Sequence, residues 1–542
     1  MSLASKFPST FPTQGDSSLS EVQEGAKAFK GRYLIDGKIH IWQGPEKDII
    51  SPIRRRNGSE LEPIVIGTMP LLNSEESLKA LDAACQAYSN GSGAWPTMSV
   101  AQRIEHIEKF IPLMVQQREI VVRLIMWEIA KSRGDAEKEF DRTVTYIIQT
   151  VAELKRMDRE YSRFTIDAGY FAQIRRSPLG VVLCMGPFNY PLNETFATLI
   201  PALIMGNTVV FKPPRFGVLL HQPLLTAFRD AFPKGVVNTV FGTGDTTASP
   251  MMQSGKIDVL ALIGSDRVAD LLKKLHPRPH RMRSILGLGA KNPAIILEDA
   301  DLNHAVNECV MGALSFNGQR CTAIKIIFVH RKVADIFLEK ICLQIEELSI
   351  GMPWDPGVKI TPIPEIGKPE QLAELLKDAT DRGARIINKN GGEITESFVR
   401  PALVSDVDKT MQLWTVEQFG PIVPVHVYDD LEEVLDYVSS ATVGQQIALF
   451  GQSPQVLGAL IDRLVNQVSR ININGQCQRG PDTFPFTGRK SSAEGTLSVH
   501  DALRSFSIRT MVAGAVNESN KNLASEIITT RSSKFLSTDF LF

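Results

Sequence analysis

The chain has 542 residues, of which 43% are hydrophobic and 22% are charged, and its formal net charge is −1. This length and apolar content suffice for large cores and predict about two to four packing units rather than one. Because a nearly neutral chain offers no broad basic field, neither a nucleic-acid backbone nor an anionic membrane is expected as a partner.

Targeting, membrane and metal signals are weak. The apolar stretch 179–211 is interrupted by prolines and asparagines, so it contains no uninterrupted apolar span of about 20 residues and no membrane helix is expected. Residues 1–20 lack arginine and an apolar core, which favours a disordered N-terminus of a cytoplasmic protein over a targeting segment. The six cysteines form no CxxC pair, which argues against a zinc site and a disulfide framework, so we expect no metal and reduced thiols.

Elements can be predicted in chain order from the spacing of apolar residues. Within residues 74–157 they recur at helical spacing, as at Ile104, Ile107 and Ile111, which predicts successive amphipathic helices. Short β-branched runs then alternate with helix-like stretches, and strands are expected at 180–185, 208–212, 236–241 and 259–263. This alternation predicts a mostly parallel sheet with right-handed crossovers, as in nucleotide-binding folds.

A second strand-and-helix block extends over about residues 294–496. Strands are expected there at 294–297, 324–329 and 421–427. Beyond residue 517 the chain is polar and without clear periodicity until the closing Phe-Leu-Phe, so a flexible tail is expected.

Cys321 is the candidate nucleophile. It follows a glycine-containing turn, stands beside Arg320 and precedes a β-type run. Arg320 and local backbone N–H groups would favour the thiolate, which is the reactive form of cysteine. Taken alone, the pattern fits a small buried hydrophobic residue better than a nucleophile.

Five segments, in this order, resemble the aldehyde dehydrogenase superfamily. They are residues 178–193 (PLGVVLCMGPFNYPLN), 211–214 (FKPP), 317–325 (NGQRCTAIK), 417–421 (EQFGP) and 479–490 (RGPDTFPFTGRK). Within the superfamily they are most similar to the non-phosphorylating, NADP-dependent glyceraldehyde-3-phosphate dehydrogenases.

The resemblance implies an α/β fold with three parts. These are a Rossmann-like parallel-sheet cofactor domain (56–160 and 178–298), an α/β catalytic domain (299–494) and a small β oligomerisation element (161–177 and 495–517). Residues 1–55 would be an N-terminal extension and 518–542 a tail. A homodimer or homotetramer is the implied assembly.

The resemblance also implies a reaction. Cys321 would attack an aldehyde carbonyl, while the side-chain amide of Asn189 and the backbone N–H of Cys321 hold the oxyanion. Hydride transfer to a nicotinamide would leave a thioester. Glu417 would bind the nicotinamide ribose, with Phe419 beside it in the same motif. Without the resemblance, Asn189 would fit equally well as a turn residue before Tyr190.

The cofactor side of the site is predicted from strand ends. Lys212 closes an expected strand, at the edge where nucleotide ribose and phosphate groups sit in such folds. Gly242 and Ser265 follow the next two expected strands, where tight turns let the chain approach a cofactor. Relatives that prefer NAD carry an acid three positions after this lysine, whereas this chain has Arg215. Because an arginine can bind a 2′-phosphate, NADP is favoured over NAD.

Matching motif positions assign a substrate pocket to Arg142, Tyr190, Arg320 and Arg479. Three guanidiniums converging on one dianion would make a phosphate clamp, because the planar fork matches phosphate oxygens. The implied substrate is a phosphorylated aldehyde such as glyceraldehyde 3-phosphate. Each arginine considered singly is more often a solvated or salt-bridged side chain.

One departure from the family pattern concerns the thioester. Relatives that hydrolyse it carry a glutamate that activates water, but residues 286–293 (LGLGAKNP) place Gly287 there. Losing a general base typically slows the step it serves by about 10²- to 10⁴-fold. Another group, such as Glu417 or Glu494, could activate water, or an external thiol such as coenzyme A could take the acyl group. A slow nucleotide-binding or assembly scaffold is the third and least favoured possibility, because the matched residues would have little reason to stand together in it.

Overall fold

The computed structural model describes residues 11–13 and 17–540. Its larger sheet has eight strands, of which five, β9, β8, β7, β10 and β11, run parallel to one another. In spatial order the strands are β2 (Lys38–Ile41), β1 (Arg32–Ile35), β9 (Val237–Thr239), β8 (Thr208–Lys212), β7 (Val181–Met185), β10 (Val259–Ile263), β11 (Arg283–Gly287) and β23 (Ala493–Glu494).

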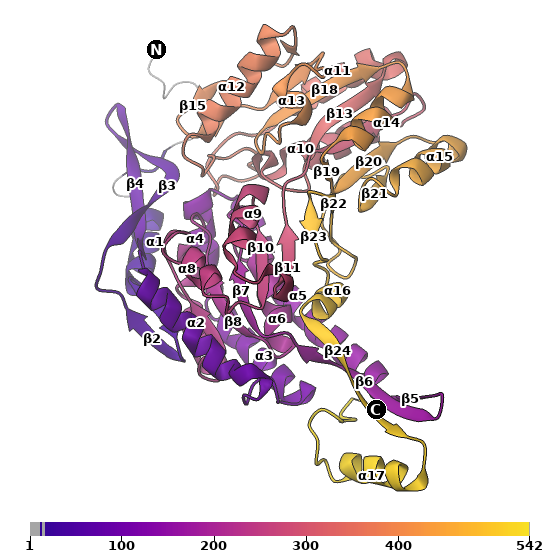
Figure 1. Ribbon diagram of the computed structural model, residues 1–542. Coiled ribbons are helices and arrows are strands. Elements are labelled where there is room, and N and C mark those ends of the chain that lie inside the picture. The colour runs from indigo at the N-terminus through magenta and orange to yellow at the C-terminus, as the bar shows by residue number, and fades with distance from the viewer. Residues whose placement is uncertain (1–10, 14–16, 541–542) are drawn as a thin grey trace.

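Helices cover this sheet (Figure 1). They are α2 (Ser74–Tyr88), α3 (Val100–Val115), α4 (Arg118–Ile129), α5 (Arg133–Tyr161), α6 (Asn193–Ile204), α7 (Leu225–Ala231), α8 (Ala248–Gln253) and α9 (Asp266–Leu275). Every residue of α6 is buried, since it crosses from β7 to β8 inside the domain. The helices expected over residues 74–157 and the four strands expected between 180 and 263 are confirmed.

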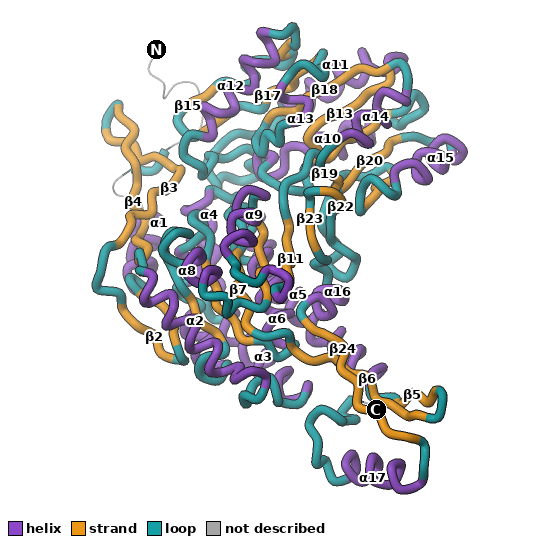
Figure 2. Tube along the Cα trace, in the orientation of Figure 1, coloured by secondary structure: helices purple, strands orange, loops and turns teal. Residues whose placement is uncertain are grey.

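The second α/β unit has a seven-stranded sheet, with parallel pairing throughout except at β14. In spatial order its strands are β14 (Arg385–Ile386), β17 (Ala402–Ser405), β18 (Ile422–Tyr428), β13 (Ile324–His330), β12 (Asn292–Ile296), β20 (Gln446–Phe450) and β21 (Arg470–Ile473). Its longer helices are α10 (Leu302–Leu314), α11 (Arg331–Glu346), α12 (Lys368–Asp381), α14 (Leu431–Ser440) and α15 (Pro454–Leu464). Figure 2 shows the loops that lie between the two units.

A small antiparallel sheet projects away from both units (Figure 1). It consists of β5 (Phe164–Asp167), β6 (Tyr170–Pro178) and β24 (Ser507–Ala515), with α16 (Val499–Ser505) before β24 and α17 (Glu518–Thr529) after it. Within the described ranges, no helix is both long and apolar enough to cross a bilayer.

The predicted boundaries need three corrections, of which the first concerns the N-terminal extension. β1 pairs with β9 through Leu34 and Thr239, so residues 32–41 belong to the eight-stranded sheet. Residues 17–28 form α1, which packs on the hairpin of β3 (Glu46–Asn57) and β4 (Glu60–Pro70), so residues 17–20 are ordered. The disorder expected for residues 1–10 and 14–16 lies outside the described residues.

The other two corrections concern β12 and the tail. β12 hydrogen-bonds to β13 and β20, so the unit boundary falls between β11 and β12 rather than at residue 298. The predicted flexible tail is wrong for residues 518–540. Beyond α17 the chain folds back against β6 and α5, where Arg175 donates to the carbonyl of Ser537 at 2.5 Å and Arg159 donates to the carbonyl of Phe540 at 2.8 Å.

Candidate active site

The loop before Cys321 is held in an unusual backbone conformation. Phe316, Asn317 and Gly318 all have positive φ angles, of 49°, 55° and 70°. A Cβ at Gly318 would lie 2.7 Å from two backbone oxygens, so only glycine fits. The Asn317 side chain donates to the carbonyl of Thr361 at 2.9 Å and accepts from its N–H at 3.0 Å. Such strain persists only where surrounding contacts enforce it, and it is common at functional sites.

Cys321 follows this loop and is half-buried. Its backbone carbonyl accepts hydrogen bonds from Asn292 at 2.8 Å and from the Lys325 ammonium at 2.7 Å. Burial raises the pKa of the thiol to about 11, and the negative charge of Glu194 contributes in the same direction, against the smaller opposing effect of Lys325. The resting form is therefore the thiol.

The prediction that Arg320 stabilises the thiolate of Cys321 is wrong. Its guanidinium donates to the carbonyl oxygens of Met311 and Gly312, at 3.2 and 2.7 Å, in the last turn of α10. A helix C-terminus attracts a cation, so the tertiary fold gives Arg320 a partner other than the sulfur.

We expect the alkylation of Cys321 by iodoacetamide to accelerate about tenfold per pH unit between pH 7 and pH 9. With a pKa of about 11, the thiolate is a minor species throughout this range and its fraction rises as pH rises. The rate can be measured by mass spectrometry of the peptide that carries Cys321. A rate that levels off below pH 8 would contradict the raised pKa.

Asn189, the predicted oxyanion residue, is bonded to the loop that carries Cys321. Its side chain is buried, and its amide nitrogen donates to the carbonyl of Gln319 at 2.9 Å, two residues before Cys321. The carbonyl of Asn189 accepts from the buried ammonium of Lys131 at 2.7 Å. These contacts fix the amide beside the nucleophile loop.

A buried ion pair behind Asn189 was not predicted from the sequence. Lys131 and Glu139 are fully buried, with their charged atoms 2.5 Å apart. Glu139 also accepts from the backbone N–H groups of Leu192 and Asn193 at 3.0 and 3.2 Å, and the ammonium lies 3.6 Å from the ring centroid of Tyr190. The pair braces the segment that carries Asn189, and no local sequence signal marks it.

The predicted cofactor residues follow strands β8, β9 and β10. Lys212 is buried, its pKa is lowered to about 8 by desolvation, and its ammonium makes one long hydrogen bond of 3.3 Å to the carbonyl of Pro213. Gly242 has a φ of 132°, and a Cβ there would lie 3.3 Å from backbone atoms of Leu72. Ser265 caps α9. Carboxyl ends of parallel strands share one edge, so these three residues lie along it.

Two further predicted cofactor residues lie on the EQFGP segment. Glu417 is ion-paired to Lys325 at 2.8 Å, and a Cβ at Gly289 would lie 2.8 Å from its second carboxylate oxygen. Phe419 has a φ of 45° and its ring contacts Phe188 at a centroid distance of 5.9 Å. Glycine at 289 therefore allows this segment to approach the strand end at residue 287.

Arg215, the predicted 2′-phosphate residue, is exposed. Its guanidinium is 3.6 Å from a carboxylate oxygen of Glu365 and lies over the ring of Phe216 at 4.7 Å. An exposed ion pair at this distance contributes little to stability. The guanidinium is thus available to another anion.

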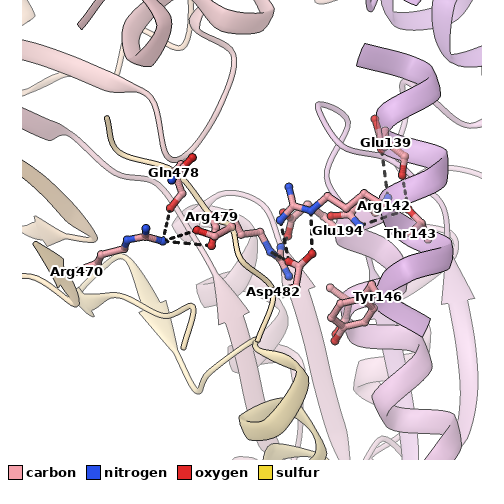
Figure 3. Close-up of polar contacts among 12 residues, drawn as sticks. Glu139, Arg142, Thr143, Tyr146, Glu194, Arg470, Gln478, Arg479 and Asp482 are labelled. Carbon is pink, nitrogen blue, oxygen red and sulfur yellow. Dashed lines mark hydrogen bonds and ion pairs between the residues drawn. The ribbon is translucent and has the colours of Figure 1, made fainter. Parts of the chain in front are cut away.

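The predicted phosphate clamp is only partly assembled. Arg142 donates twice to Asp482, both times at 2.8 Å, while Arg479 is ion-paired to Asp482 at 3.3 Å and to Glu194 more closely (Figure 3). Arg142 and Arg479 therefore converge, but on carboxylates of their own chain, and Arg320 does not join them. We call Arg142, Glu194, Arg479 and Asp482 the charged cluster; its two positive and two negative groups balance.

Comparison with known proteins agrees with this geometry. Residues 55–512 match the aldehyde dehydrogenase family. The chain belongs to the aldehyde dehydrogenase family. This confirms the predicted fold and enzyme family.

Two similar relatives are the NADP-dependent glyceraldehyde-3-phosphate dehydrogenases of Streptococcus equinus and Pisum sativum. The first is 32% identical over 80% of this chain and 90% of the relative, and the second 28% identical over 87% and 92%. A crystal structure of the NADP-dependent glyceraldehyde-3-phosphate dehydrogenase of Bacillus halodurans C-125 complexed with NADP superposes with a TM-score of 0.82. It is 29% identical and covers 90% of this chain and 100% of that one.

Gly287, predicted to replace the general base of hydrolytic relatives, leaves room for a side chain. A Cβ at Gly287 would meet the Ile263 side chain at 3.4 Å, an ordinary contact. Of the two replacement bases considered, Glu494 is half-exposed and paired to Lys273 at 2.8 Å. Glu417 is paired to Lys325. Each carboxylate is engaged through one oxygen, and Glu417 is also the residue predicted to bind the nicotinamide ribose.

Proposed function

We propose that this aldehyde dehydrogenase uses NADP to oxidise an aldehyde to the acid through a thioester on Cys321. The observation that carries the proposal is the buried amide of Asn189, held 2.9 Å from the nucleophile loop by its bond to Gln319. The relatives described as NADP-dependent support the choice of cofactor.

The residues of the chain account for the acylation steps. The Cys321 sulfur attacks the carbonyl carbon, and the resulting oxyanion replaces the Gln319 carbonyl as acceptor of the Asn189 amide and also accepts from the backbone N–H of Cys321. Each such donor is typically worth about 2.7–4 kcal/mol in the transition state. Because the resting thiol is protonated, it must lose its proton as the substrate is attacked. NADP, when bound, supplies the acceptor for the hydride that leaves the substrate carbon.

Several residues fit the cofactor. Lys212 is a buried ammonium with one long hydrogen bond, Gly242 admits close approach, and Ser265 lies at the start of α9 along the same sheet edge. Buried charged groups without good partners are rare and call for a ligand. Lys212 and Ser265 would hold the adenosine half, Arg215 the 2′-phosphate and Glu417 the nicotinamide ribose.

Replacing Arg215 with glutamate should shift the ratio of NADP to NAD affinity toward NAD by about 10- to 100-fold. The charge-assisted bond to the 2′-phosphate, about 1.5–3 kcal/mol, would be lost and a repulsive charge introduced. The Kd values of both nucleotides, measured by fluorescence titration, test this, with E365Q as a control that removes only the partner of Arg215. An unchanged ratio would refute the role of Arg215.

The finer proposal is a phosphorylated aldehyde such as glyceraldehyde 3-phosphate, with Arg142, Arg479 and Tyr190 around the phosphate and without Arg320, which is held by the carbonyl oxygens of α10. Names of relatives and the convergence of Arg142 with Arg479 support it. Since both guanidiniums already hold carboxylates, the phosphate has to compete with Asp482 and Glu194. The phosphate group is therefore expected to raise kcat/KM by less than it would if the two arginines had no carboxylate partners.

Initial rates on glyceraldehyde 3-phosphate, glyceraldehyde and succinic semialdehyde, each with NAD and NADP, test this function. A higher kcat/KM for the phosphorylated aldehyde with NADP is the expected result. Equal values would remove the phosphate assignment while leaving aldehyde oxidation intact. Turnover that requires coenzyme A would favour the acylating alternative, and nucleotide binding without reduction of any NADP would favour the scaffold.

A homo-oligomer is proposed from the projecting sheet. Ile166, Tyr170 and Met511 expose 67%, 60% and 62% of their surface there, on β5, β6 and β24. Several large exposed apolar side chains on so small a sheet are more typical of an interaction surface than of free surface. A dimer or tetramer, and a cytoplasmic location, stay predictions.

A further inference from the structure

Glu194 is a buried carboxylate to which the sequence patterns assigned no role. It lies in the first turn of α6, and its backbone N–H donates to the carbonyl of Tyr190 at 3.1 Å. Its side chain is 8% exposed and ion-paired to Arg479 through one oxygen, Oε2 (Figure 3). Among the hydrogen bonds of the described residues, none reaches the other oxygen, Oε1.

Glu194 also stands close to the nucleophile. The segment that leads into α6 is bonded to the nucleophile loop through the amide of Asn189 and the carbonyl of Gln319, 2.9 Å apart. Of the charged groups around Cys321, Glu194 is the one that most strongly raises the pKa of the thiol. The segment that carries Glu194 therefore lies beside the loop that carries Cys321.

Other acidic groups of the site are committed elsewhere. Glu417 is paired to Lys325 and is proposed to hold the nicotinamide ribose, and Glu139 is fully buried against Lys131 and two backbone N–H groups. Asp482 accepts from both Arg142 and Arg479. Glu494 is half-exposed and paired to Lys273.

We propose that Glu194 is the general base that hydrolyses the acyl-enzyme, in place of the carboxylate missing at position 287. This proposal rests on the proposed function, since it needs a thioester at Cys321. Oε1 takes a proton from water as the water oxygen bonds to the thioester carbon. The carbon–sulfur bond then breaks, the acid leaves, and the sulfur takes a proton to restore the thiol.

The Arg479 guanidinium has two effects on this base. It orients the carboxylate, and it occupies Oε2, so only Oε1 is left to accept a proton from water. With one of its two oxygens occupied, Glu194 should hydrolyse the acyl-enzyme more slowly than an unpaired glutamate would. We therefore expect hydrolysis, rather than hydride transfer, to limit turnover.

A cofactor-free reaction tests the proposal. p-Nitrophenyl acetate acetylates a cysteine and releases p-nitrophenolate, so acetylation and hydrolysis of the acetyl-enzyme can be followed without NADP. The Glu194→Gln variant should release one p-nitrophenolate per subunit at least as fast as the parent, because loss of the negative charge lowers the pKa of the Cys321 thiol, and should then turn over about 10²-fold more slowly. Intact mass should show the acetyl adduct accumulating, and the C321S variant corrects for reaction at other cysteines.

Two variants sharpen the comparison. Glu494→Gln removes the carboxylate of a residue that pairs with Leu286 on the neighbouring strand, and this variant should hydrolyse its acetyl-enzyme at the parent rate. Adding Gly287→Glu to the Glu194→Gln variant should restore hydrolysis, because position 287 has room for a side chain. If Glu194→Gln does not fold, Glu194→Asp keeps the charge beside Arg479 but withdraws it by one methylene, and should slow hydrolysis alone.

The outcomes separate this proposal from the function on which it rests. Parent-rate hydrolysis in folded Glu194→Gln, or equal loss of acetylation and hydrolysis, would overturn the base assignment only. Loss of hydrolysis in Glu494→Gln would overturn it too. A parent enzyme that is not acetylated at Cys321 would instead remove the thioester mechanism itself.

Discussion

Replacing Cys321 with serine is expected to lower kcat for aldehyde oxidation by a factor on the order of 10⁴ or more, the scale seen when a covalent nucleophile is removed. A hydroxyl is far harder to deprotonate than a thiol. The site already raises the pKa of the thiol to about 11, so it offers even less help to an alkoxide. Initial rates of NADPH formation at saturating aldehyde measure the effect.

Cys85→Ser is a matched control for this experiment. Burial raises the pKa of Cys85 to about 11 as well, but this residue lies on α2, outside the proposed site. The control should retain the parent kcat. If Cys321→Ser oxidised the substrate within tenfold of the parent rate, the covalent mechanism would be wrong.

Replacing Asn189 with alanine is expected to lower kcat by about 10²- to 10³-fold, the usual cost of one oxyanion donor. KM should change less, because the amide bonds to the Gln319 carbonyl before the reaction and to the oxyanion only as charge develops. The variant leaves that carbonyl without its partner, so stability should fall by about 1–3 kcal/mol. Steady-state kinetics and urea unfolding give the two quantities.

Asn193→Ala is the matched control for Asn189. Asn193 is as deeply buried and lies four residues on, but its amide makes only a 3.4 Å contact with Thr143. Its kcat should stay within tenfold of the parent. Equal losses in the two variants would show that the segment tolerates no change and would withdraw the specific role of Asn189.

Local patterns account for most of the fold. Apolar spacing located the helices α2 to α5, and β-branched runs located β7, β8, β10 and β13 to within a residue or two. These signals are strong because the apolar pattern of a helix repeats over several turns, and a buried strand is a continuous run of β-branched residues. The four-residue strand β1 and the tail after α17 carry no such repeat, so their places follow from contacts with Thr239, Arg175 and Arg159.

Part of the candidate site could likewise be predicted from local sequence, and part could not. Cys321 and Asn189 could be proposed from the sequence because both lie in segments that resemble the family, and the structure brings their loops together. The partners of the arginines were not predictable. Arg320 faces the carbonyl oxygens of α10, and Arg479 faces Glu194, which is 285 residues away along the chain.

From the order of residues alone one obtains the family, the proposed nucleophile and the absence of a glutamate at position 287, since each lies in a short contiguous motif. The protonation of Cys321, the neutralisation of the arginines and the position of Glu194 depend on burial and on charges from distant segments. Electrostatic energies depend on the distances between charges and on their solvent exposure, and both take fixed values only when the chain has folded.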